Sequence, residues 1–165
     1  LYRKASSNHR MGIENIIVTD FQSQYSSKFY ELNKIWIEES WVLEDSDKKD
    51  LLNPNKIIQN GGQIFFAIGN HAVIGTVAMI KNSDKVYELA KMTVESNFRG
   101  KGIANLLMDK CIEFALEKKA IEIFLISNDS LVIARNLYDK YGFKEVILDS
   151  QKYNRGNVKM MLSLV

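Results

Sequence analysis

The chain of 165 residues has one cysteine, two histidines and only a small net charge of +2. A single cysteine excludes an intramolecular disulfide, and with two histidines it also excludes the Cys–His spacings of a zinc site. The longest run without a charged residue, Ile57–Ile80, is broken by glycines, amides and a histidine, so it is not a membrane span. The weak positive charge does not indicate a nucleic acid or a membrane surface as partner.

What remains is the composition of an ordinary globular domain, with 46% apolar and 25% charged residues. Area scaling predicts that a chain of this length buries about 70% of its extended surface, which is enough for one core. The sequence contains no repeat, low-complexity tract or linker. We therefore expect a single domain over residues 11–165.

The first ten residues, Leu1–Arg10, show neither helical nor strand periodicity and no apolar core, and the first methionine is Met11. We interpret residues 1–10 as a disordered leader or a remnant of recombinant expression, and whether they are native stays open. They do not resemble a signal peptide. With a single thiol and no export signal, the sequence favours the cytoplasm.

The first half of the chain predicts one strand, one long helix and then three strands. Ile13–Thr19 reads as the strand, and apolar spacing predicts a helix over Lys28–Val42. Pro54 marks the beginning or end of a further helix. The three consecutive strands are separated by turn residues, Gly69-Asn70-His71 being a hairpin signal, and they cover Gln63–Ile68, Ala72–Ile80 and Val86–Val94.

The second half alternates helices and strands. A helical stripe begins after Gly102, and a β-rich run, Ile121–Ser127, follows it. A strand–helix–strand unit implies that this run lies parallel to Val86–Val94. A second helix ends at Gly142, a favourable residue just past a helix C-terminus, with Phe143 packing back. Two closing strands follow, Lys144–Leu148 and Val158–Leu164. The fold class is therefore α/β (α+β), a central mixed sheet flanked by helices.

The most informative segment is Asn97–Ala104, NFRGKGIA, between a strand and a helix. Its two glycines permit a close backbone turn, and free N–H groups at a helix N-terminus bind anions. A Walker loop would need Ser or Thr after a Gly-Lys pair, and a dinucleotide fingerprint would need a third small residue where Asn105 stands. A phosphate-bearing ligand is the natural occupant, and a turn without a ligand is the alternative.

This loop resembles the pyrophosphate loop of the GNAT superfamily of N-acetyltransferases, Arg/Gln-x-x-Gly-x-Gly/Ala, which Arg99–Ala104 fits in full. The segment Asn136–Phe143, NLYDKYGF, is similar to the family's C-terminal Leu-Tyr-x-x-x-Gly-Phe element. Loop, Leu-Tyr element and strand order together cover about residues 62–148. The resemblance implies the acyl-CoA N-acyltransferase fold.

The resemblance also implies acetyl coenzyme A as the ligand, with no metal. In the family, loop N–H groups hold the pyrophosphate, which here assigns Arg99, Gly100, Lys101, Gly102, Ile103 and Ala104. Main-chain groups of the preceding strand pair with the pantetheine arm like an extra strand, which assigns Met92, Thr93 and Val94. Asn128, just after the next strand, matches a further cofactor contact.

Glu88 is the candidate base. Strict alternation along Val86–Val94 would put Glu88 on one face with Ala90, Met92 and Val94, and a carboxylate on an otherwise apolar face is typical of a functional site. The alternative is a strand-end carboxylate that reaches water or a salt bridge. Several family members carry an acidic base on this strand, and the sequence leaves open whether Glu88 acts directly, through water or not at all.

Tyr138 occupies the family's general-acid position in the Leu-Tyr element, and as a plain member of an apolar helix stripe it could instead be core. Tyr141, one turn on, is more typical of packing. Cys111 falls on a buried helix face and behaves as a small hydrophobe. Trp36 and Trp41 are expected to pack the first helix, and Trp41 could instead line an acceptor pocket.

Two sets of polar residues are each expected to have a structural role, with a functional role as the alternative. The acidic residues Glu38, Glu39, Glu44, Asp45 and Asp47 are expected to form a solvated face, or alternatively to attract a cationic amine. Tyr153, Arg155 and Asn157 are expected to form a loop, or alternatively to bind the acceptor.

We conclude that the sequence predicts transfer of acetyl from acetyl coenzyme A to an amine by direct attack in a ternary complex. The alternative is a non-catalytic acyl-CoA sensor on the same fold, since fold alone does not define function. A nicotinamide-dependent oxidoreductase is a third, weaker interpretation. The acceptor stays open between a small amine, an amino acid, a protein N-terminus and a lysine side chain. No nucleic acid or membrane partner is expected. A homodimer is compatible with the sequence, which does not determine the oligomeric state.

Overall fold

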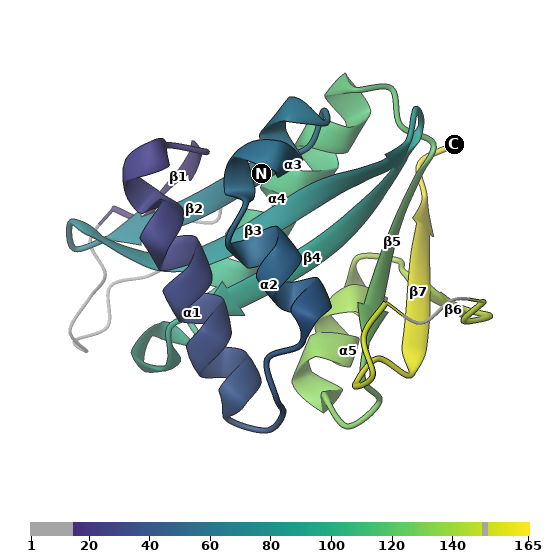
Figure 1. The fold of residues 1–165 in the computed structure, drawn as a ribbon. Coiled ribbons are helices and arrows are strands. Elements are labelled where there is room, and N and C mark those ends of the chain that lie inside the picture. Colours follow the sequence, from purple (N-terminus) through teal and green to yellow (C-terminus); the bar gives the residue numbers. More distant parts are fainter. Residues whose placement is uncertain (1–14, 150–151) are drawn as a thin grey trace.

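The computed structural model describes residues 15–149 and 152–165. Its centre is a mixed sheet with the strand order β1-β2-β3-β4-β5-β7-β6 (Figure 1). Among the strands of the described residues only β4 and β5 are parallel neighbours, as the strand–helix–strand pattern predicts. The strands are β1 (Ile17–Asp20), β2 (Gln63–Gly69), β3 (Ala72–Ser83), β4 (Val86–Val94), β5 (Glu122–Ser127), β6 (Lys144–Val146) and β7 (Val158–Ser163). The expected α/β fold class is thereby confirmed.

Helices cover both faces of the sheet, and each face has its own apolar cluster. In one cluster α1, α2 and α3 pack on the sheet, with Phe29 and Ile37 of α1 near Phe66 of β2. In the other α4 packs on the opposite face, with Leu107 of α4 and Leu125 of β5 as members and side chains of α5 packed against them. The helices are α1 (Ser26–Glu38), α2 (Asp45–Leu51), α3 (Pro54–Gln59), α4 (Ile103–Glu117) and α5 (Val132–Lys140).

Most predicted elements are present, with shifted ends. The β2–β3 hairpin closes through Asn70 and His71, whose φ angles of 52° and 62° are those of a type I′ turn. Gly142 follows α5 with φ 90°, and the N–H of Phe143 donates to the carbonyl of Tyr138, so that predicted helix end is confirmed. Ile13 of the first predicted strand, and the predicted leader over residues 1–10, lie outside the described residues.

The predicted end of the first long helix is wrong. The helix ends at Glu38 rather than Val42, and the acidic segment after it forms a further helix, α2, which the sequence did not predict. The N–H of Glu44 donates to the carboxylate of Asp47 at 2.9 Å, which stabilises the first turn of α2. The residues between α1 and α2 reverse the chain so that α2 can lie over the sheet beside α1, as Figure 1 shows.

Strands β4 and β5 are paired at one end only. Their register consists of Val86–Glu88 against Glu122–Phe124, and beyond it β5 continues to pair with β7 on its other side. The sheet therefore opens between the second half of β4 and the end of β5. An opening of this kind leaves main-chain hydrogen-bonding groups of both strands without a strand partner.

A β-bulge in β4 overturns the predicted common face of Glu88, Met92 and Val94. Between the pairs Thr76–Thr93 and Ala78–Ala90, two residues of β4 stand against one of β3, and Lys91 takes a φ of 57°. The extra residue reverses the alternation. Glu88 and Ala90 lie opposite Ile80 and Ala78 on the α1–α3 face, while Met92 and Val94 pack with the α4 cluster.

Every helix within residues 15–149 and 152–165 is too short or too polar to traverse a lipid bilayer.

Candidate active site

The opening between β4 and β5 contains a cavity of about 760 Å³. Its walls are the second half of β4, the end of β5, the first turn of α4, part of α5, and side chains from α1. Most of the residues predicted for the site line it, from Arg99 at the loop to Glu88 deep in the sheet. The fold therefore brings together the two motifs that the sequence separates by some forty residues, the loop and the Leu-Tyr element.

The loop end of the cavity has the features of an anion site. Gly100 and Gly102 adopt φ values of 76° and 82°, and a Cβ added at either glycine would meet no heavy atom within 4 Å. Gly102 precedes α4, whose first N–H groups have no acceptor within the helix, and the helix dipole adds positive potential there. Lys101 is the exception among the predicted loop residues, since it does not line the cavity and its Nζ lies 5.6 Å from the Phe98 ring centroid.

The main chain of β4 presents hydrogen-bonding groups to the cavity. The N–H of Glu95 donates to the carbonyl of Ile74, so Val94 forms a non-hydrogen-bonded pair with β3 and its own N–H and carbonyl point away from β3. Arg99 Nε donates to that carbonyl of Val94 at 3.0 Å. By alternation the groups of Met92 point the same way, and those of Thr93 face β3.

Asn128 lies where the sequence predicts it, at the end of β5 on the cavity wall. Its side chain is engaged within the protein, because Nδ2 donates to the carbonyl of Arg155 and Oδ1 accepts from Ser130. Asn128 therefore connects the turn before α5 to the segment before β7.

Tyr138 lies on α5 with its half-buried ring on the cavity wall and 6.0 Å, centroid to centroid, from that of Phe143. Desolvation raises the pKa of the Tyr138 phenol to about 12, so it carries its proton at neutral pH. Tyr141 behaves differently, because its hydroxyl donates to Asp109 at 2.7 Å and fastens α5 to α4. Cys111 is fully buried on α4, and burial raises the pKa of its thiol, as expected for a packing residue.

Glu88 is 5% exposed and lines the same cavity. Its Oε1 accepts a hydrogen bond from Lys152 Nζ at 2.9 Å, and Lys152 also pairs with Asp50 at 3.0 Å. Within the described part of the chain, Glu88 Oε2 is buried and has no hydrogen-bond partner. The salt-bridge alternative is therefore present for one oxygen, and the other stays available to a ligand.

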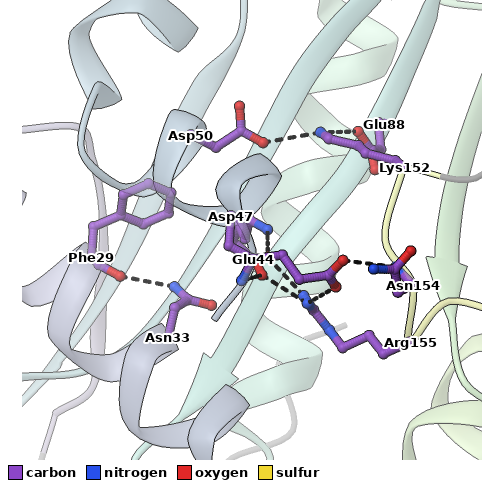
Figure 2. Close-up of polar contacts among 10 residues, drawn as sticks. Phe29, Asn33, Glu44, Asp47, Asp50, Glu88, Lys152, Asn154 and Arg155 are labelled. Carbon is purple, nitrogen blue, oxygen red and sulfur yellow. Dashed lines mark hydrogen bonds and ion pairs between the residues drawn. The ribbon is translucent and has the colours of Figure 1, made fainter. Parts of the chain in front are cut away.

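The expectation that Glu44 and Asp47 form a solvated face is wrong. Asp47 is fully buried and accepts hydrogen bonds from Lys91 Nζ at 2.6 Å and from both terminal nitrogens of Arg155 at 2.8 Å. Arg155 also binds Glu44 at 3.0 Å, as Figure 2 shows. Burial alone would raise the pKa of Asp47, but the hydrogen bonds from Arg155 and the charge of Lys91 outweigh it and lower the pKa to about 2. Glu38, Glu39 and Asp45 are exposed, as predicted.

The segment before β7 forms a loop, as predicted, and two of its side chains also line the cavity. Tyr153 is 5% exposed, lines the cavity with Arg155, and has Lys91 Nζ 4.4 Å and the Arg155 guanidinium 4.7 Å from its ring centroid. Trp36 and Trp41 also line the cavity, with ring centroids 5.8 Å apart. Sequence reasoning missed Lys91, and the only available indication was a lysine interrupting an apolar strand.

No group of three or more His, Cys, Asp and Glu side chains that could hold a metal ion occurs in the described ranges 15–149 and 152–165. The cavity suits an organic ligand with an anionic end, because it has backbone donors at one end and carboxylate and phenol groups at the other.

Comparison with known proteins agrees with this geometry. The family model described as Acetyltransferase (GNAT) family matches residues 11–143. The chain belongs to this family of acetyltransferases, and the resemblance inferred from the loop and the Leu-Tyr element is confirmed.

Curated relatives match about half of the chain. N-acetylaspartate synthetase of Xenopus tropicalis is 40% identical over 89 residues, which are 53% of this chain and 33% of the relative. The human protein of that name is 36% identical over 87 residues, 52% of this chain and 29% of the relative. The chain thus spans about a third of the length of these relatives.

Solved structures match over nearly the whole chain. A GNAT-family acetyltransferase from Staphylococcus aureus Mu50 superposes with a TM-score of 0.84 at 25% identity, covering 92% of this chain and all of that one. A GNAT acetyltransferase from Elizabethkingia anophelis, solved with acetyl-CoA bound, has a TM-score of 0.69 at 17% identity, covering 92% of this chain and 99% of that one. At 17% identity, the similarity to the E. anophelis protein shows a shared fold only.

Replacing the buried Asp47 by Asn is expected to destabilise the protein by about 3–5 kcal/mol, because the change leaves the buried Lys91 without its counter-charge and Arg155 with Glu44 alone. Urea unfolding of both proteins at neutral pH measures the difference. Asp45→Asn, on the same helix but exposed, is the matched control and should cost well under 1 kcal/mol. Equal losses for the two variants would contradict the role given to Asp47.

The Asp47 contribution is expected to depend on pH in the acidic range only. The pKa of Asp47 is lowered by folding, so its contribution is complete above the unfolded pKa near 4 and is lost as the pH falls toward 2. The difference in unfolding free energy between the native protein and Asp47→Asn should be constant from pH 7 to 5 and smaller by about 1 kcal/mol at pH 3. A difference that is flat down to pH 3 would contradict this pKa.

Proposed function

We propose that the protein transfers an acetyl group from acetyl coenzyme A to an amine by direct attack in a ternary complex. The observation that carries the proposal is the single cavity that joins the glycine turn at the start of α4 to Glu88 and Tyr138 through the opening between β4 and β5. One end suits a diphosphate and the other offers groups that can accept and donate protons.

The cofactor assignment rests on the loop and on neighbours of the same fold. The E. anophelis structure is described with acetyl-CoA bound, and one from Thermoplasma acidophilum with coenzyme A. In this chain the N–H groups of residues 99–104 would hold the pyrophosphate. The N–H of Val94 and the main-chain groups of Met92 would pair with the pantetheine arm as a strand does.

The acceptor must lose a proton before it can attack. A primary amine with a pKa near 10.4 is only about 0.04% neutral at pH 7. In the proposed mechanism Glu88 accepts the amine proton, directly or through water, while the nitrogen forms its bond to the thioester carbon. The carbon–sulfur bond then breaks and the thiol sulfur leaves with electron density that needs a donor.

Tyr138 is the proposed donor. Its phenol stays protonated because of its raised pKa, so it offers a hydrogen bond to the sulfur at every pH where the enzyme would work. A free thiolate, with a pKa near 8.5, is too weak a base to deprotonate such a phenol fully. Tyr138 therefore stabilises the departing sulfur through its hydrogen bond as the carbon–sulfur bond breaks, and the coenzyme A thiolate then takes its proton from solvent.

The acceptor is not assigned by the relatives. The relatives named N-acetylaspartate synthetase are longer proteins, and this chain spans about a third of their length. Small amines, amino acids, protein N-termini and lysine side chains are all compatible with the reaction proposed here, and we place that reaction in the cytoplasm.

Tyr138→Phe is expected to lower kcat for a consumed amine by about 10²–10⁴-fold with little change in acetyl-CoA affinity, because only the hydrogen-bond donor to the sulfur is lost. Thiol release measures turnover and calorimetry measures binding. Tyr141→Phe is the matched control, since it removes a hydroxyl that lies outside the cavity and should leave kcat within about twofold. Unchanged kcat in Tyr138→Phe would exclude this role.

Glu88→Gln is expected to lower kcat/KM for the amine by about 10²–10⁴-fold, because the amide cannot accept the proton. Glu95→Gln, just beyond the end of β4, is the control. If acetyl-CoA bound normally but no amine in a broad panel were consumed by the native protein, the non-catalytic sensor would be favoured instead.

Ala104→Glu is expected to weaken acetyl-CoA binding by about tenfold or more, because a carboxylate in the first turn of α4 repels the diphosphate. A glutamate in this turn suits the helix dipole, so the fold is not expected to suffer. Ala104→Gln has nearly the same size without the charge and should bind almost normally. Equal affinities of the two variants, measured by calorimetry, would exclude the pyrophosphate site.

A further inference from the structure

We propose that the acceptor is a cationic amine with no carboxylate beside its amino group, bound where Glu88 and Tyr153 line the cavity. This inference rests on the acetyl transfer proposed above. It concerns the part of the cavity away from the α4 loop, where Trp36, Trp41 and Arg155 also contribute to the wall.

Every cation near this part of the cavity is already bound to a carboxylate. Lys91 lies 2.6 Å from Asp47, Arg155 lies within 3.0 Å of both Asp47 and Glu44, and Lys152 lies 2.9 Å from Glu88. Both terminal nitrogens of Arg155 are used in these contacts. Among the residues that the structure describes, this region therefore offers no unpaired cation to a substrate carboxylate.

The buried polar atoms that lack a hydrogen-bond partner in this region are oxygens rather than cationic nitrogens. Glu88 Oε2 is a buried carboxylate oxygen without a hydrogen-bond partner in the described ranges, and the same is true of the Tyr153 hydroxyl. Both side chains are 95% buried and both line the cavity. Buried polar atoms of this kind normally have a partner. An ammonium group, with three donors and no acceptor, supplies donors to both.

The net charge of the ion-paired side chains in this region also favours a cationic ligand. Four carboxylates (Glu44, Asp47, Asp50 and Glu88) are joined to three cations (Lys91, Lys152 and Arg155), which leaves one negative charge in excess. A bound ammonium would neutralise it. A carboxylate placed next to that ammonium would instead lie among acidic groups in a region of low dielectric, where like charges repel strongly.

The aromatic side chains add to this preference. Trp36, Trp41 and Tyr153 line the cavity, and the faces of such rings attract cations. Tyr153 already has three cations near its ring centroid: Lys91 at 4.4 Å, Arg155 at 4.7 Å and Lys152 at 5.3 Å. The indole rings are the faces left for a ligand.

The test compares amines that differ only by a carboxylate. Tyramine and tyrosine, tryptamine and tryptophan, and histamine and histidine are such pairs, each with one primary amino group, and aspartate is added as an acidic acceptor. We expect the member without the carboxylate to have a kcat/KM at least about tenfold higher in each pair that reacts, and aspartate to be a poor acceptor. Equal or higher kcat/KM for the carboxylate-bearing members would overturn the inference and leave acetyl transfer intact.

Binding separates the two proposals. Calorimetry of each pair with the protein saturated by coenzyme A reports the preference without turnover. A preference for the cationic member with no acetylation of any amine would support the cation site and overturn the proposed reaction. Absence of amine binding and of turnover would overturn both.

A variant connects the preference to the cluster. Glu44→Gln removes one partner of Arg155 while keeping an oxygen that can accept from the N–H of Asn154. We expect the preference for the carboxylate-free member to fall at least about threefold, because a cation is partly released. Glu38→Gln, which removes an exposed carboxylate paired with Lys34, is the control and should leave the ratio unchanged. An unaltered ratio in Glu44→Gln, with unfolding midpoints equal to those of the control, would overturn the role of the ion pairs.

Discussion

The buried carboxylate of Asp47 holds three separate parts of the chain together. It comes from α2, accepts from Lys91 in the bulge of β4, and accepts from Arg155 in the segment before β7. Removing charges from water is costly, and such a group is stable only when its hydrogen-bonding capacity is filled. Asp47 meets this condition with four hydrogen bonds, including the one from the N–H of Glu44. The wall of the cavity opposite the α4 loop depends on this contact.

The bulge and the ion pair explain one another. Lys91 has a φ of 57°, a conformation that costs a non-glycine residue about 1–2 kcal/mol. The ion pair with Asp47 and the position over the Tyr153 ring compensate for that cost. The extra residue also reverses the alternation of β4, so Glu88 lies on the face of α1–α3 while Met92 and Val94 lie on the face of α4. One strand thus supplies both a polar side chain and a main-chain edge to the same cavity.

Local features were predictable where the backbone conformation restricts the residue type. The loop glycines, the Asn70-His71 turn and the Gly142 helix end all follow from backbone conformations that few residues tolerate. The bulge was not predictable, since strict alternation fits Val86–Val94 without it. The ends of α1 and the presence of α2 were also missed, because short polar helices owe their stability to contacts that lie far along the chain.

From its sequence alone this chain could be recognised as a mixed α/β acetyltransferase domain with a glycine-rich turn before a helix, because glycine spacing and apolar periodicity act over a few residues. The partners of the charged side chains were decided only by the tertiary structure. Asp47 and Arg155 are 108 residues apart, and nothing local distinguishes a buried carboxylate from a solvated one. Whether a charge is satisfied depends on which distant groups the fold brings within about 3 Å of it, and that determines what the cavity has left to offer a substrate.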